Sequence, residues 1–178
     1  YIKSIQEKYN ASIFPISNLT QGTACTVLLA RDHINNDTPM IIANSDQIVD
    51  INFHEFIKDA LTRDLDGSIL TFSNPEKNPK WSFAKINERM NVTEVKEKDP
   101  ISSNATVGIY FFKKGSYFVE SAIDMILNQD TVNGEYYTCP VYNYLISKNL
   151  VIGIYGIKEQ QMHGIGTPKD LDNYLKIL

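Results

Sequence analysis

The feature that most constrains the fold is an unbroken apolar run that ends near a carboxylate, in the segment PMIIANSDQIVD at residues 39–50. Residues Met40–Ala43 follow one another without polar alternation, which favours a central strand that is buried on both faces. In an open α/β sheet, ligands bind beyond the carboxyl ends of such strands. Asp46 stands at that end, so it is either a turn cap, the commoner role of aspartate there, or a carboxylate on the ligand side.

The flanking segments predict an alternation of helices and strands. We expect strands at Ser12–Ile16, Met40–Ala43, Ser68–Phe72, Thr106–Phe112 and Leu150–Ile157, a hairpin from Ser82–Asn87 and Val92–Glu97, and helices at Tyr1–Tyr9, Gln21–Ile34, Phe53–Asp64, Ser116–Leu127, Tyr137–Ser147 and Lys169–Leu178. The order of strands and helices in the first half implies a mostly parallel sheet with right-handed crossovers. No linker or repeat interrupts the pattern, so a single α/β domain over residues 1–178 accounts for it.

Composition argues against several classes of function. The net charge of −4 argues against a broad nucleic-acid surface, and no apolar stretch is long enough to span a bilayer. Cys25 and Cys139 lie in no spacing typical of metal ligands, and we expect both to be reduced thiols. The sequence therefore predicts a cytoplasmic protein with neither nucleic acid nor membrane as a partner.

Motifs for nucleophilic catalysis are absent from the sequence. It has neither a Gly-x-Ser-x-Gly turn nor a phosphate loop ending in Gly-Lys-Ser/Thr, and its three histidines form no constellation. Two weaker signals are the charged tetrapeptide at 97–100 and the Gly22-Thr23-Ala24 helix start. Taken singly, the first is typical of a solvated turn and the second of a helix cap.

The order of the short motifs is more specific than any one of them. Along the chain come Gln-Gly-Thr-Ala at 21–24, Asn-Ser-Asp at 44–46, Glu-Lys-Asp-Pro at 97–100, Ala-Thr-Val-Gly-Ile-Tyr at 105–110, Gly-Glu-Tyr-Tyr at 134–137 and Gly-Ile-Gly-Thr-Pro-Lys-Asp-Leu at 164–171. This series resembles the sugar-phosphate nucleotidyltransferases, or nucleotide-sugar pyrophosphorylases, especially those associated with capsule and lipopolysaccharide synthesis. The resemblance runs from about Thr20 to Tyr174. It implies a Rossmann-like α/β fold with a mixed, mostly parallel sheet flanked by helices.

The resemblance also implies roles for individual residues. The nucleotide would contact Gly22, Thr23, Asn44 and Ser45. The sugar phosphate would contact Glu97, Lys98, Thr106, Gly108 and Glu135. Asp46 would hold Mg²⁺, and Asp46 and Lys98 would be the catalytic residues. The partners would be a nucleoside triphosphate and a phosphorylated sugar or similar metabolite, and homo-oligomerisation is left open.

The implied reaction suits these residue types. An acceptor phosphate attacks the α-phosphorus of the triphosphate, and pyrophosphate leaves. Because the attacking group is already an anion, catalysis depends on charge neutralisation and in-line positioning, for which Mg²⁺, a carboxylate and a lysine are suited. Mg²⁺ takes few protein ligands, so one aspartate is sufficient.

Two features depart from the family pattern. The glycine-rich Gly-x-Gly-x-Arg loop would precede Tyr1, so we expect the sequence to be an N-terminally truncated piece of a longer protein. Gly164 stands where many relatives carry a second metal-binding aspartate, and His163 is expected to be a neutral turn histidine rather than its replacement.

Two other functions stay open at this point. A catalytically inactive, nucleotide-binding regulatory module is favoured if the loop is truly missing. A nucleotide-sugar-dependent glycosyltransferase is the other alternative, although such enzymes usually carry Asp-x-Asp where this sequence has Asn-Ser-Asp at 44–46.

Overall fold

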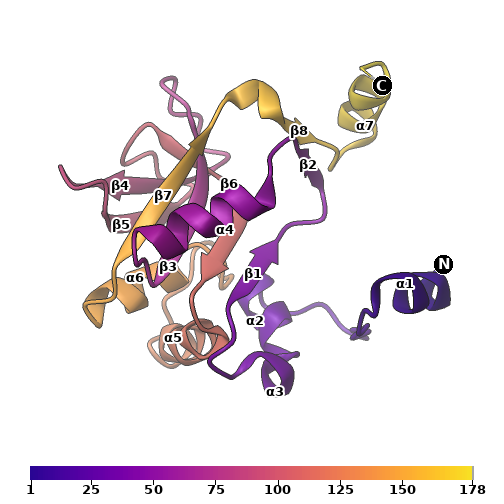
Figure 1. Cartoon of the computed structure of the whole chain (residues 1–178), viewed down its shortest axis with the longest axis horizontal. Helices are drawn as coiled ribbons and strands as arrows, with labels where there is room; N and C mark the ends of the chain where they lie inside the picture. Colours follow the sequence, from indigo (N-terminus) through magenta and orange to yellow (C-terminus); the bar gives the residue numbers. More distant parts are fainter. Residues whose placement is uncertain (178) are drawn as a thin grey trace.

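The computed structural model describes residues 1–177, and its centre is a mixed β-sheet flanked by helices (Figure 1). The large sheet contains β1 (Met40–Ala43), β3 (Gly67–Ser73), β4 (Ser82–Ile86), β5 (Val92–Glu97), β6 (Asn104–Phe112) and β7 (Ile152–Ile157). A small second sheet pairs β2 (Gln47–Val49) with β8 (Met162–Gly164). The helices are α1 (Ile2–Tyr9), α2 (Thr23–Leu28), α3 (Arg31–Ile34), α4 (Phe53–Thr62), α5 (Gly115–Leu127), α6 (Val141–Ser147) and α7 (Pro168–Leu175). The expected α/β class is confirmed.

The strand directions differ from the mostly parallel pairing that the sequence predicts. Within the described residues β3 and β7 pair in parallel, whereas the pairs β1–β6, β3–β6, β4–β6 and β4–β5 are antiparallel. Strands β1 and β3 do run in the same direction, because each is antiparallel to β6. The order of elements predicts this common direction. It does not reveal that β6, which comes much later in the chain, pairs with both β1 and β3.

The apolar run at Met40–Ala43 forms a strand, but the expectation of a central strand buried on both faces is wrong for the described residues. β1 pairs with β6 alone, its first three residues are half-buried, and Ala43 is exposed. Met40 and Ile42 pack against the core on one side of the sheet and Ile41 against the core on the other. Contact with two cores explains a continuous apolar run even in a strand with one partner.

Three other expected elements need correction. Ser12–Ile16 forms no strand, because its apolar side chains are exposed and no neighbouring strand pairs with it. The helix expected at Gln21–Ile34 is divided into α2 and α3, with a turn at Leu29-Ala30 between them. The helix expected from Tyr137 begins at Val141, after Pro140, whose ring disfavours helical geometry at the residue before it.

Other expectations hold. The hairpin of β4 and β5 and the helices α4, α5 and α7 form where the sequence predicts them. The Thr167 hydroxyl caps α7 by accepting a hydrogen bond from the backbone N–H of Asp170 at 3.2 Å. The predicted last residue of that helix, Leu178, lies outside the described residues. Cys25 and Cys139 are free thiols. No helix within residues 1–177 has the length and apolar character needed to cross a bilayer.

Each face of the sheet is covered by its own helices. Alternate residues of β6 divide between two cores, with Val107, Ile109 and Phe111 on the α4 side and Tyr110 and Phe112 on the side of α5 and α6. Figure 1 shows α4 across one face, and α5 and α6 together with α2 and α3 at the lower end.

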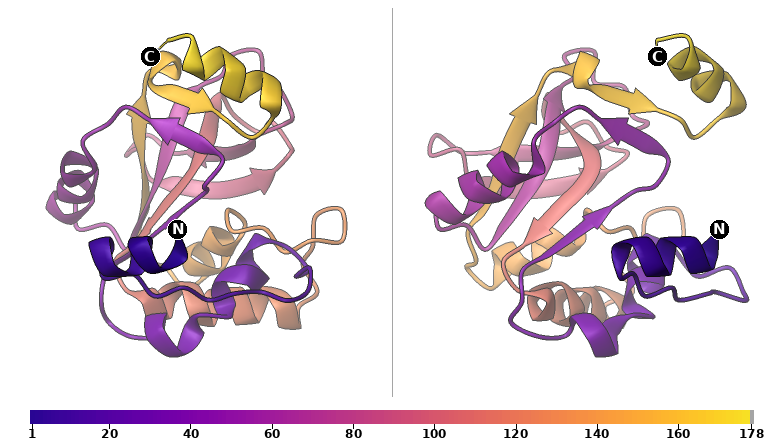
Figure 2. Two further views of the ribbon diagram at one scale, coloured as in Figure 1. Left: turned by 90° about the vertical axis from the view of Figure 1, so that its right-hand side faces the viewer. Right: turned by 45° about the vertical axis from the view of Figure 1, so that its right-hand side comes forward.

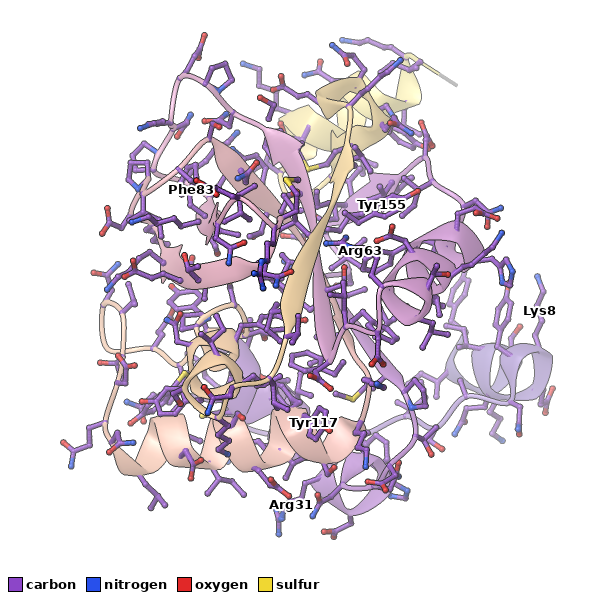
Figure 3. All side chains as sticks on the ribbon, turned by 60° about the vertical axis from the view of Figure 1, so that its left-hand side comes forward. Lys8, Arg31, Arg63, Phe83, Tyr117 and Tyr155 are labelled. Atoms are coloured by element: carbon purple, nitrogen blue, oxygen red, sulfur yellow. The ribbon has the colours of Figure 1, made fainter. Side chains whose placement is uncertain are left out.

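Arg63 and Tyr155 fix α4 to the sheet. The Arg63 guanidinium donates to the backbone carbonyl of Ile154 in β7 at 3.0 Å, and the Phe56 and Tyr155 rings meet edge to face at 5.5 Å (Figure 3). The end of the sheet opposite α5 and α6 carries β2, β8 and α7 (Figure 2). These elements and the helices at the lower end leave the site described below between them.

Tyr142 offers a test of the packing on the α5 and α6 side. Its ring is buried, it stacks on Phe112 at 4.7 Å, and its hydroxyl donates to the Phe111 carbonyl at 2.8 Å. We expect Tyr142→Phe to lower the free energy of unfolding by about 1–2 kcal/mol, the cost of losing a buried hydrogen bond. Urea unfolding measures this change. Tyr117→Phe is the control, since no described residue accepts a hydrogen bond from that hydroxyl, and an equal loss in both variants would contradict the assignment.

Candidate active site

A cleft of about 650 Å³ opens where the ends of several elements meet. Its walls come from the start of α2, the segments after β1 and β5, one face of β6, the turn before α6, and the β8–α7 region. The polar lining residues include Thr23, Asn44, Asp46, Gln47, Lys80, Ser82, Glu97, Lys98, Thr106, Tyr110, Tyr137, Thr138, Glu159, Thr167 and Asp170. Segments far apart in the sequence thus face one space.

Asp46 lies in the turn that follows β1 and faces this cleft. Its backbone carbonyl accepts a hydrogen bond from Ile165 at 2.8 Å, which anchors the turn to the segment after β8. Its carboxylate is exposed and makes no hydrogen bond or ion pair with any described residue. The side chain therefore caps no backbone group in this part of the chain, and its oxygens are available to a ligand.

The floor of the cleft is one face of β6. Because side chains alternate along a strand, Thr106, Gly108 and Tyr110 share this face. Gly108 has a φ of +86°, and a Cβ there would come within 2.5 Å of the Asn44 side-chain nitrogen. The backbone N–H of Asn44 donates to the Gly108 carbonyl at 3.0 Å. Glycine is favoured here because other residues rarely adopt this φ, and the Asn44 amide also packs directly over the strand.

Glu97 ends β5 and is half-buried in the wall of the cleft. The Ser82 hydroxyl donates a hydrogen bond to its carboxylate. Burial raises the pKa of Glu97 above its ordinary value, and the hydrogen bond from Ser82 opposes this effect. A half-buried carboxylate held by one hydroxyl can accept further hydrogen bonds from a polyol.

Lys98 follows immediately and has a left-handed backbone with a φ of +56°. Its backbone N–H donates to the Trp81 carbonyl at 3.0 Å, and its ammonium donates to the Tyr137 hydroxyl at 2.8 Å. The hydrogen bond to Tyr137 raises the pKa of Lys98 above its ordinary value. The side chain thus presents a full positive charge to the cleft.

The segment at 21–24 is joined to the segment at 136–138. Tyr136 donates its N–H to the Gln21 carbonyl at 2.9 Å and accepts from the N–H of Ala24 at 3.0 Å. The Thr23 hydroxyl accepts from both the backbone N–H and the hydroxyl of Thr138, each at 3.0 Å. Contacts between residues more than a hundred positions apart therefore fix this wall.

Gly22 is essential to that junction. Its φ of +111° and ψ of 172° are essentially restricted to glycine, and a Cβ would lie 2.5–2.9 Å from the Tyr136 backbone. We expect Gly22→Ala to lower the free energy of unfolding by about 2–4 kcal/mol, from backbone strain and overpacking together. Gly134→Ala is a matched control, because Gly134 also has a positive φ but has open space around it. Equal losses in urea unfolding would contradict the steric argument.

The structure brings most of the residues singled out from the sequence to the cleft. Its lining includes Thr23, Asn44, Asp46, Glu97, Lys98, Thr106 and Gly108. Gly22, Ser45 and Glu135 are not part of the lining, although each adjoins or lies close to it in sequence. The roles of these residues stay predictions.

Other lining residues had no role assigned from the sequence. Gln47 donates through its side chain to the Val107 carbonyl, and Lys80 places its ammonium 4.5 Å from the Trp81 ring centroid. Tyr137 and Thr138 lie in or beside the Gly-Glu-Tyr-Tyr motif, which was the only signal for them. Gln47 and Lys80 carried no such signal, since neither lies in a motif of the series.

His163 does not take the place of the second metal-binding aspartate that many relatives carry at the position of Gly164. Side chains alternate along β8, so that Met162 and Gly164 face the cleft and His163 does not. Its imidazole lies 2.7 Å from the Asp50 carboxylate and is 17% exposed. A Cβ at Gly164 would meet nothing within 4 Å.

The residues present fit a magnesium ion that is shared with a substrate. No group of three or more His, Cys, Asp or Glu side chains within residues 1–177 could form a closed metal cage. Mg²⁺ instead commonly binds one or two carboxylates together with waters and phosphate oxygens. The unpartnered Asp46 carboxylate suits that mode, and Gly166 keeps the space beside it open, because a Cβ there would lie 3.3 Å from Asp46 Oδ2.

Comparison with protein families decides the assignment. Residues 3–135, about three quarters of the sequence, match the family described as nucleotidyl transferase. This chain belongs to that family. The match includes α1 through α5 and the segment up to Glu135, so most elements of this nucleotidyl transferase's cleft lie within it. Comparison with curated proteins gave no significant match.

Solved structures support the same fold for this nucleotidyl transferase. A nucleoside-diphosphate-sugar pyrophosphorylase from Vibrio cholerae aligns with a TM-score of 0.74 and 26% identity, over 90% of this chain and 67% of its own. A protein described as a candidate glucose-1-phosphate thymidylyltransferase from Bacillus anthracis, solved with sucrose, aligns with a TM-score of 0.74 and 17% identity, over 99% of this chain and 70% of its own. The second likeness bears on the fold alone.

Proposed function

We propose that this protein transfers a nucleoside monophosphate from a nucleoside triphosphate to a sugar phosphate or similar phosphorylated metabolite and releases pyrophosphate. The observation that carries the proposal is the meeting of Asp46 and Lys98 in one cleft. A carboxylate that forms no hydrogen bond or ion pair with a described residue, together with a charged lysine above a polar floor, suits a reaction between two phosphates. Family membership and the likeness to a pyrophosphorylase support the same reaction class.

In this proposal the protein positions the two substrates and neutralises their charge. The ammonium of Lys98 meets the phosphate of the acceptor, which attacks the α-phosphorus of the triphosphate while pyrophosphate leaves on the opposite side. The acceptor needs no general base, because its phosphate is already ionised. Positioning and electrostatic stabilisation therefore supply the rate enhancement.

The Asp46 carboxylate is the proposed protein ligand for Mg²⁺, which when bound supplies neutralisation of the triphosphate charge. The nucleoside lies against Gly22 and Thr23 in this proposal, with Asn44 and Ser45 nearby. The fixed junction between residues 21–24 and 136–138 supports that placement, because a rigid backbone wall presents unchanging hydrogen-bonding groups to a base.

The acceptor is placed on the other side of the cleft, against Thr106, Gly108 and Glu97, with Glu135 close by. The hydroxyls of Thr106 and Tyr110 on the floor, and the Ser82 hydroxyl and Glu97 carboxylate of the adjoining wall, give this side several polar groups. Such a surface suits a ligand with many hydroxyl groups, which favours a sugar phosphate over a less polar phosphorylated metabolite. The product would be an activated sugar, and the resemblance of the motif series extends the proposal to capsule or lipopolysaccharide synthesis in the cytoplasm.

A substrate panel tests the proposal. Full-length protein is incubated with Mg²⁺, each of ATP, CTP, GTP, UTP and dTTP, and a set of sugar phosphates that includes glucose 1-phosphate and mannose 1-phosphate. We expect pyrophosphate release that requires both a triphosphate and an acceptor. Pyrophosphate release without an acceptor, or no release with any pair of triphosphate and acceptor, would contradict the proposed reaction.

A further inference from the structure

Lys98 can act on a phosphate only if its ammonium is held in place. The side chain is exposed and long, so holding it in one position costs conformational entropy. Lys98 forms no ion pair with any carboxylate within residues 1–177. The Lys98 ammonium instead donates a hydrogen bond to the hydroxyl of Tyr137 at 2.8 Å, and Tyr137 lies thirty-nine positions further along the chain.

Tyr137 is itself fixed from both sides. Its neighbour Tyr136 exchanges backbone hydrogen bonds with the 21–24 segment, and its other neighbour, Thr138, is joined to the Thr23 hydroxyl. The tyrosine side chain has few rotatable bonds and a rigid ring. Its hydroxyl is therefore a well-defined anchor on the cleft wall, whereas the lysine that it contacts is flexible.

The chemistry of a phenol suits this task better than that of a carboxylate. A carboxylate would hold the ammonium but would also cancel the charge that has to meet a phosphate. A neutral hydroxyl accepts the hydrogen bond and leaves the positive charge available. The Glu135 carboxylate, which can accept the phenol proton in a hydrogen bond, raises the pKa of Tyr137, and Lys98 opposes this effect.

We infer that Tyr137 is a positioning residue, which holds the Lys98 ammonium at the place where the acceptor phosphate binds. The inference rests on the proposed function, because it assigns to Tyr137 an effect that acts through Lys98. It also explains why the wall at 136–138 is joined so closely to the 21–24 segment. The junction that supports the nucleotide side would at the same time set the position of the charge on the acceptor side.

A double-mutant cycle tests the inference on the full-length protein. Turnover and KM are measured for wild type, Tyr137→Phe, Lys98→Ala and the double variant, with the triphosphate and sugar phosphate that react fastest in the panel. We expect Tyr137→Phe to lower kcat/KM for the sugar phosphate by about 10- to 100-fold, with the KM for the triphosphate nearly unchanged. In the Lys98→Ala background the same change should have almost no further effect, because the two residues act as one unit.

Tyr144→Phe is the matched control. Tyr144 donates its hydroxyl to Asp130 at 3.2 Å, and it does not line the cleft, so its loss should leave both KM values and turnover unchanged. Melting temperatures establish that all variants are folded, and Tyr137→Phe keeps the ring and every backbone contact of its neighbours.

The outcomes separate the inference from the proposed function. Wild-type kinetics in Tyr137→Phe, or an equal loss in both backgrounds, would overturn the positioning role while leaving the nucleotidyl transfer intact. A Lys98→Ala variant with wild-type turnover would overturn the proposed role of Lys98, and the inference with it. A loss confined to the background that contains Lys98 is the result that the inference requires.

Discussion

Replacing Asp46 by asparagine is expected to lower turnover by about 10²- to 10³-fold while leaving the protein as stable as before. The change keeps the shape of the side chain and removes the negative charge proposed to anchor Mg²⁺. Loss of one preorganised electrostatic contact in an active site has an effect of about this size on the rate. The carboxylate has no hydrogen bond or ion pair with another described residue, so no structural contact is lost, and the melting temperature should stay equal or rise slightly.

Turnover at saturating Mg²⁺ and the melting temperature are measured together for wild type and Asp46→Asn. Asp172→Asn on α7 is the control, because that aspartate is exposed and does not line the cleft. Near-equal turnover of wild type and Asp46→Asn would refute the metal site.

Lys98→Ala is expected to lower turnover by a similar factor of about 10²–10³, because it removes the positive charge proposed to meet the acceptor phosphate. The hydrogen bond from Lys98 to Tyr137 raises the pKa of this lysine, so the ammonium stays charged up to and beyond its ordinary pKa. A rise of pH within the neutral range should therefore not reproduce the loss. Stability should change little, since the side chain is exposed and lies in no described ion pair.

Two further variants sharpen this prediction. Lys96→Ala removes an exposed lysine of β5, two positions before Lys98. Its ammonium lies 3.7 Å from Glu94 and not in the cleft, so this variant should keep wild-type turnover. Lys98→Arg retains the charge but not the compact ammonium, so we expect its turnover to lie between those of Lys98→Ala and wild type. A Lys98→Ala enzyme that loses no more than Lys96→Ala would show that Lys98 takes no part in the reaction.

The sequence predicted local elements well where one physical signal governed them. The hairpin at 82–97 followed from alternation and a turn between its strands, and α7 followed from Thr167 and Pro168 at its start. Ser12–Ile16 shows the limit of this reasoning. Its apolar residues favour a strand, but a strand needs a partner to satisfy its backbone hydrogen bonds, and a partner is a tertiary fact that local sequence does not contain.

The order of the strands in the sheet was harder to predict from the sequence for the same reason. The helix between β1 and β3 indicated that both strands run in one direction, and they do. That each of them pairs with β6 depends on packing between segments tens of residues apart. The continuous apolar run of β1 predicts a central strand, whereas among the described residues β1 pairs with β6 alone and contacts a different core with each face.

The candidate site was predicted through the order of its motifs rather than through local chemistry. Asp46 and Glu97–Lys98 were each ambiguous alone, and only the series placed them together. The roles of the neutral side chains Tyr137 and Gln47 could not be predicted in this way. Tyr137 depends on a side-chain contact across the cleft, and Gln47 on a contact with the backbone of β6, neither of which has a sequence signature.

A crystal structure of the full-length protein with Mg²⁺, a non-hydrolysable triphosphate analogue and a sugar phosphate tests the central claim most directly. We expect the base to lie against Gly22 and Thr23 and the acceptor phosphate to lie within hydrogen-bonding distance of the Lys98 ammonium. A second groove, of about 480 Å³, is lined by residues that include Asp50, Asn52, Tyr155 and Gln161. Nucleotide bound in that groove, with the cleft between Asp46 and Lys98 empty, would contradict the account.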